Sequence, residues 1–186
     1  MVKYNYFENL EKLSSISASA VERACKGEVG ADLSELRKSC DRLVCETEDA
    51  LFSDFLPPLE RDNIAATAHT LSRIVDRASE LLSDSAVCPS FMKNNDEAKI
   101  CIRLSQVLCG EISLLKKIKR PNETPDLQGY RILLREGRCA HKQMLQKLRS
   151  GSLPKSCGEA IILTGRLRSE LSGAFDELVE IMLNNI

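Results

Sequence analysis

The two histidines are the first residues to consider for chemistry, because histidine serves as a general base and as a common metal ligand. They are His69 and His141. A di-iron helical bundle needs a glutamate three residues before each histidine, but Ala66 and Arg138 stand there. Cys139 could serve His141 as a nucleophile, yet residues two apart do not face each other on a helix. With no HExxH, GxSxG or phosphate-loop motif either, the sequence argues against an enzyme.

The cysteines offer a second kind of chemistry. All eight are at positions 25, 40, 45, 88, 101, 109, 139 and 157. Zinc sites usually take ligands from closely spaced pairs, and no CxxC pair occurs. Thiols in a reducing compartment stay reduced. We therefore interpret the cysteines as small apolar core residues rather than as a metal or disulfide framework.

Asp76 is a third candidate, in the stretch from Phe55 to Leu82. Apolar residues recur there every three or four positions after a pair of prolines, which predicts a long helix. Asp76 lies close to the apolar stripe of that helix. Two interpretations stay open: a metal ligand or other functional group, or a polar residue at the edge of a helical seam.

Helical periodicity runs through nearly the whole chain and predicts the elements that position these side chains. Apolar stripes cover 7–24, 33–51, 64–82, 100–118, 127–148 and 161–182. Gly27 ends the first helix, a loop covers 87–95, and Thr124–Pro125 begins the fifth helix. Six long helices with short loops predict an all-α, antiparallel bundle. We expect one domain, 1–186, made of two three-helix units, 1–86 and 95–186.

Composition agrees with a helical bundle, because 43% of the 186 residues are apolar but only 4% are aromatic. Leu, Ile, Val and Ala must therefore fill the core. The N-terminus lacks the apolar run of a signal peptide, and no segment has the ~18 to 20 apolar residues that span a bilayer. We expect a cytoplasmic protein without a membrane span.

Charge is uneven although the net charge is only −1. The segment from Lys116 to Lys155 holds eleven Lys or Arg and three acids. Such a region is either a solvated face of two helices or a surface for phosphate, acidic lipid or an acidic partner. No helix-turn-helix unit frames it, so we do not favour nucleic acid as the partner.

The stretch LFSDFLPPLERDNI, from Leu51 to Ile64, resembles the signature of the PhoU-like proteins. It is most similar to their short branch, encoded beside Pit-type phosphate transporters. The matching positions are Leu51, Phe55, Pro58, Leu59, Glu60, Arg61, Asp62, Asn63 and Ile64. The resemblance covers 32–82 and implies a doubled three-helix bundle, a cytoplasmic location, self-association and a role in regulating phosphate uptake.

The resemblance also implies iron or zinc sites on carboxylate pairs four residues apart, which share one helical face. In this sequence the eight positions hold Arg37, Asp41, Ser72, Asp76, Arg135, Cys139, Gly165 and Ser169. Only Asp41 and Asp76 keep an acid, and two aspartates leave a metal cluster undercoordinated. Arg37 four residues before Asp41, and Arg73 three before Asp76, would supply positive charge instead. We expect a metal-poor protein, with iron or zinc at Asp41 and Asp76 as the alternative.

The sequence thus favours a non-enzymatic regulator or accessory protein of inorganic phosphate transport that acts by protein–protein interaction. Its partner would be a membrane phosphate transporter or a signalling protein, with the basic region 116–155 as a docking face. The alternative is a divergent helical-bundle adaptor that has lost metal binding and any phosphate role.

Overall fold

Helices make up every regular element of the described chain, as the periodicity predicted. The computed structural model describes residues 4–28, 32–55, 57–85, 89–117 and 127–184. Its α-helices are α1 (Tyr6–Lys26), α2 (Ser34–Ser53), α3 (Arg61–Ser85), α4 (Pro89–Lys93), α5 (Asp96–Leu114), α6 (Leu127–Arg149) and α7 (Gly158–Asn184). Two short 3₁₀ turns, Leu115–Lys117 and Lys155–Cys157, follow α5 and precede α7. In this described part, no helix is long and apolar enough to cross a membrane.

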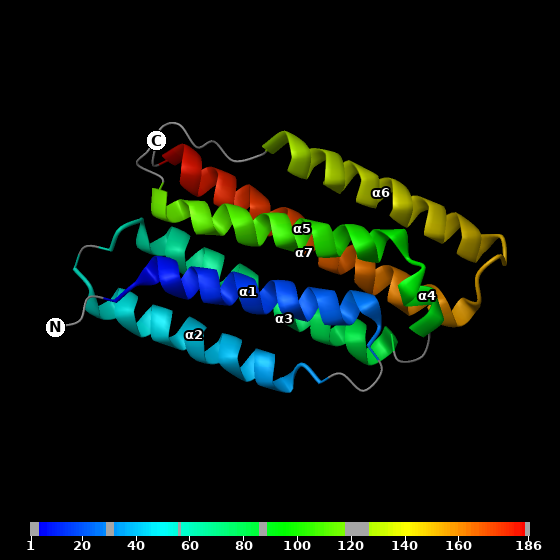
Figure 1. Cartoon of the computed structure of the whole chain (residues 1–186), viewed down its shortest axis with the longest axis horizontal. Coiled ribbons are helices and arrows are strands. Elements are labelled where there is room, and N and C mark those ends of the chain that lie inside the picture. The colour runs from blue at the N-terminus through cyan, green and yellow to red at the C-terminus, as the bar shows by residue number, and fades with distance from the viewer. Residues whose placement is uncertain (1–3, 29–31, 56, 86–88, 118–126, 185–186) are drawn as a thin grey trace.

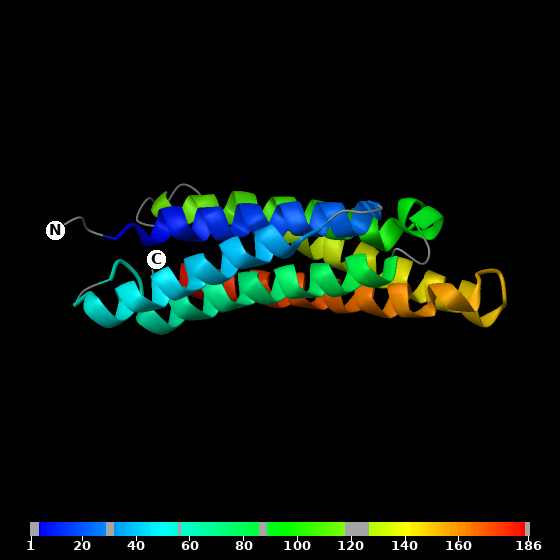
Figure 2. The same cartoon turned by 90° about the horizontal axis from the view of Figure 1, so that it is seen from below.

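Four long helices form the centre of the bundle. α1 packs against α3 and α5, and α7 closes the group by packing against the same two helices. α2 lies outside α1 and α3, and α6 lies outside α5 and α7 (Figure 1). Seen from below, α1 and α5 form one layer and α3 and α7 the other (Figure 2). The result is an elongated bundle with α2 and α6 on opposite flanks.

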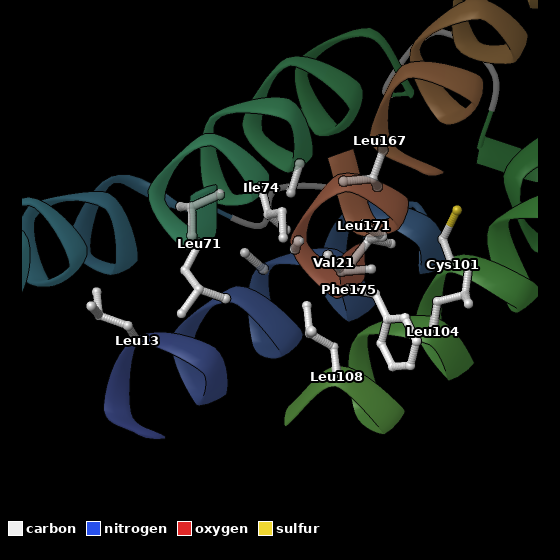
Figure 3. Packing of buried hydrophobic residues seen from close by; sticks show 14 of the residues in the cluster. Leu13, Val21, Leu71, Ile74, Cys101, Leu104, Leu108, Leu167, Leu171 and Phe175 are labelled. Carbon is white, nitrogen blue, oxygen red and sulfur yellow. The ribbon is translucent and has the colours of Figure 1, made fainter. Parts of the chain in front are cut away.

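The core is built from aliphatic side chains, with few aromatic rings among them. Figure 3 shows side chains from α1, α3, α5 and α7 meeting in one continuous cluster. Tyr130 of α6 stacks on Phe175 of α7 with 3.5 Å between ring centroids, and its hydroxyl donates to the Leu171 carbonyl at 2.5 Å. Because this cluster joins both halves of the chain, the division into units 1–86 and 95–186 stays a prediction.

Two features of the helix boundaries compare directly with the sequence. Gly27 ends α1 as expected: its own N–H donates to the Ala24 carbonyl, and its positive φ of 60° turns the chain so that the N–H of Glu28 reaches the Arg23 carbonyl. The loop expected over 87–95 is wrong in part, since the short helix α4 occupies Pro89–Lys93. Proline at a first helical position is favourable, which accounts for that turn. The start signal at Thr124–Pro125 lies outside the described residues.

Candidate functional site

Asp76 forms an ion pair between α3 and α2. Its Oδ1 lies 2.7 Å from Nη2 of Arg37, and both side chains are about half exposed. The partner expected for Arg37 was Asp41, four residues along the same helix; the structure instead pairs it across two antiparallel helices. An exposed pair of this kind contributes about 0–1 kcal/mol. Its main consequence is that a guanidinium already neutralises the Asp76 carboxylate.

The neighbouring arginines of α3 turn toward α7 instead of toward Asp76. Arg73 Nε lies 3.4 Å from one oxygen of Glu170, and Arg77 Nε lies 3.6 Å from the other. Arg73 also donates to Thr70 Oγ1 at 2.6 Å. The polar edge of α3 therefore links α2 on one side to α7 on the other. The predicted pairing of Arg73 with Asp76 is wrong.

An open pocket of about 350 Å³ lies beside this edge of α3. Its charged lining consists of Arg37, Arg73, Arg77, Asp76 and Glu80. Each of the three guanidiniums already has a carboxylate partner on α3 or α7. Because each charged group of the lining already faces an opposite charge, the pocket offers none that is free to hold an ion.

The donor atoms near Asp41 and Asp76 do not fit a metal cluster. In the part of the chain that the structure describes, no group of three or more His, Cys, Asp or Glu side chains could hold a metal ion. A cation on Asp76 would meet the charge of Arg37. In the second half, the predicted ligand positions hold exposed Arg135, Cys139 and Ser169 and the packed Gly165. Binding of a single ion at Asp41 and Asp76 stays a prediction.

A second cluster of charged side chains centres on a buried glutamate, and the sequence did not predict it. Glu97, in the first turn of α5, is fully buried between α6 and α7. Its Oε2 lies 2.8 Å from Nδ1 of His141, and Oε1 accepts from Nε of Arg168 at 2.8 Å. A carboxylate only accepts, so Nδ1 carries the proton. The sequence did contain a signal for the burial of Glu97, because Glu97 lies on the same helical stripe as the apolar residues Cys101 and Leu104.

Two glycines make room for the partners of Glu97. A Cβ added at Gly165 would lie 2.6 Å from Cε1 of His141, and one at Gly137 would lie 2.6 Å from Cδ of Arg168. α7 thus has a glycine opposite His141 of α6, and α6 has a glycine opposite Arg168 of α7. Gly165, where the family resemblance would place a metal ligand, has a packing role in this structure. Both carboxylate oxygens of Glu97 have partners, so we regard the cluster as structural.

The thiols divide into two groups by exposure. Cys25, Cys40, Cys101 and Cys157 are buried, as expected of small core residues, whereas Cys45 and Cys139 are exposed. Cys109 is intermediate, and Cys88 lies outside the described residues. Burial raises the pKa of the Cys40 thiol to about 11. That thiol stays protonated, and so weakly nucleophilic, well above neutral pH.

Labelling with a thiol reagent at about pH 8 is expected to separate these groups. Cys45 and Cys139 should react fastest, because both are exposed on the outer helices. The Cys45→Ser/Cys139→Ser protein should lose two fast equivalents and keep the slow ones. Mass spectrometry of the labelled peptides identifies the sites. Rapid labelling of Cys40 in the folded protein would contradict the burial described above.

Two solved structures share this fold. A putative PhoU-like phosphate regulatory protein from Shewanella oneidensis MR-1 aligns with a TM-score of 0.71 at 15% identity, over 97% of this chain and 96% of that chain. A PhoU-like protein from the same organism aligns with a TM-score of 0.68 at 14% identity, over 96% of both chains. No protein-family model and no curated protein matches the sequence. The chain therefore has a PhoU-like fold, as the signature predicted, and the Pit-associated branch stays a prediction.

Proposed function

We propose that this protein is a non-enzymatic regulator or accessory protein of inorganic phosphate transport that acts by protein–protein interaction. The observation that carries the proposal is the likeness in fold to a phosphate regulatory protein over nearly the whole of both chains. The polar clusters support it as well. Both oxygens of Glu97 have partners, and the pocket beside Asp76 is lined by charges that already have partners as well. We infer a cytoplasmic protein that associates with itself and with a membrane phosphate transporter or a signalling protein.

The outer face of α6 supports docking through the basic region. Arg131, Arg135, Arg138, Lys142 and Arg149 are exposed on one stripe of that helix. This stripe spans about 27 Å at 1.5 Å per residue. None of the five forms an ion pair with another described residue, so their charges are available to an acidic partner. We infer that this stripe docks on an acidic surface of the transporter or signalling protein.

Affinity purification from the native cells, combined with phosphate uptake, tests this function. The tagged protein should recover a membrane phosphate transporter or a phosphate-signalling protein, and deletion of its gene should change the rate of phosphate uptake. The Arg135→Glu/Arg138→Glu protein should lose the partner. A matched control, Lys93→Glu/Arg103→Glu, changes exposed cations on α4 and α5 by the same charge and should keep it. Unchanged uptake without any such partner would refute the proposal.

The alternative is a helical adaptor that has lost metal binding and any phosphate role. It is favoured by the residues at the expected ligand positions, among them Arg37, Ser72 and Gly165. Elemental analysis of the purified protein addresses the metal. We expect iron and zinc well below one equivalent, unchanged by Asp41→Ala or Asp76→Ala. If metal is bound stoichiometrically and each substitution removes it, a metal site with fewer ligands survives at these two aspartates.

A further inference from the structure

Two phenylalanines stand out from the surface at the connection between α2 and α3. The Phe52 side chain is 90% exposed and that of Phe55 is 89% exposed, whereas Phe175 is buried in the core. Phe52 lies in the last turn of α2, and Phe55 follows it in the connection. Large aromatic side chains contribute strongly to interfaces when a partner covers them. The exposed pair therefore indicates an interaction surface.

The backbone that carries these rings is firmly held. The guanidinium of Arg61 donates to the carbonyls of Leu51 and Asp54, and to that of Phe55 at 3.3 Å. Tyr6 of α1 donates its hydroxyl to Asp54 Oδ2 at 3.3 Å. Burial raises the pKa of Tyr6 to about 12, so its hydroxyl remains a donor at neutral pH. A partner would therefore meet a preorganised backbone, and little ordering cost would accompany binding.

Acidic residues flank the two phenylalanines along the chain. From Glu46 to Asp62 the chain holds six acids and one base, Arg61. Arg61 donates to backbone carbonyls, and its exposed side chain lines the pocket beside Phe52, so the acids outnumber the one base at this surface. Asp49 and Asp62 are exposed and form no ion pair within the described residues. Beside Phe52 lies an open pocket of about 340 Å³, where the apolar Leu51, Phe52 and Ala65 meet the charged Glu48, Arg61 and Asp62.

We propose that this acidic aromatic surface, formed by Phe52, Phe55, Asp49, Glu60 and Asp62, binds a basic protein segment that also carries apolar side chains. Apolar side chains would cover the rings and enter the pocket, while Lys or Arg would pair with the acidic rim. Cytoplasmic loops of membrane proteins have this chemistry, because they are enriched in Lys and Arg. The inference rests on the proposed function, to which it adds a second docking surface of opposite charge.

Charge and shape decide against two other occupants. An anionic bilayer would be repelled by the acidic rim. A second copy of the chain could offer the basic stripe of α6, but among the described residues of that helix Ile132 is the one large exposed apolar side chain. A rigid helix with one such residue covers two rings poorly. A flexible segment can wrap around both.

A peptide titration with the purified protein tests this surface. The probe is a fluorescent peptide that alternates lysine and leucine, and a peptide with serine in place of leucine is its control. We expect binding of the first peptide, weakened at least about tenfold in the Phe52→Ser/Phe55→Ser protein. Both rings are almost fully exposed, so the fold should persist, which circular dichroism checks. The Ile132→Ser/Leu183→Ser protein removes two exposed apolar side chains elsewhere and should bind normally.

Several results would overturn the inference. They are absence of binding, equal binding of the serine peptide, and equal affinity of the Phe52→Ser/Phe55→Ser protein. Ring-dependent binding to phosphatidylserine vesicles, or self-association that this variant abolishes in sedimentation, would assign the surface to another occupant. The titration uses the purified protein alone, so its failure leaves the role in phosphate transport standing. Unchanged phosphate uptake on gene deletion would leave this surface standing.

Discussion

Replacing Arg168 with methionine is expected to lower the free energy of unfolding by about 3–5 kcal/mol. Glu97 is fully buried, and its second oxygen would lose the charged donor that now lies 2.8 Å away. His141 would remain as the other partner. Methionine keeps most of the stem that packs over Gly137, so the loss should come from the unpaired charge. Urea unfolding followed by circular dichroism measures it.

Two companion proteins show whether the loss of stability comes from the buried unpaired charge or from lost packing. In Glu97→Leu/Arg168→Met both charges are gone, and stability should recover to near that of the wild-type protein. In Lys99→Met an exposed pair with Asp96 is broken on the same helix, and stability should change by less than about 1 kcal/mol. If Arg168→Met costs no more than Lys99→Met, water reaches Glu97 and the cluster is not structural.

The helices and their buried faces could be predicted from the sequence because both depend on local information. The spacing of Leu71, Ile74 and Ala78 already defines the core face of α3. The left-handed turn at Gly27 and the prolines before α3 mark helix ends by their own backbone preferences. The turn at Pro89 was missed because five residues are too few to show a helical period.

Contacts between side chains of different helices could not be predicted in the same way. A sequence places Arg37 on a face of α2, but it does not fix how α2 is rotated and shifted against α3. That rotation brings Asp76 to Arg37, while the closest candidate in sequence was Asp41. The same limit hid Glu97, whose partners come from two other helices. The exposure of Phe52 and Phe55 could not be predicted either, because the sequence pattern at the connection of α2 and α3 is compatible with buried and with exposed rings.

Gly165 and Gly173 of α7 are expected to respond to alanine in opposite directions. At Gly165 a Cβ would lie 2.6 Å from the His141 ring, so the ring must leave the position in which it contacts Glu97. We expect a loss of about 1–3 kcal/mol in the free energy of unfolding from this overpacking. At exposed Gly173 a Cβ meets nothing within 4 Å. There alanine should stabilise the helix by roughly 0.5–1 kcal/mol.

Urea unfolding of both proteins measures the difference, and a double substitution assigns its cause. His141→Ala removes the ring that the new methyl group would strike, so Gly165→Ala should cost little in that background. The coupling energy between positions 141 and 165 should therefore be large, whereas positions 141 and 173 should be additive. If Gly165→Ala is as harmless as Gly173→Ala in the wild-type background, His141 shifts freely. Its contact with Glu97 would then contribute little to the packing of α5, α6 and α7.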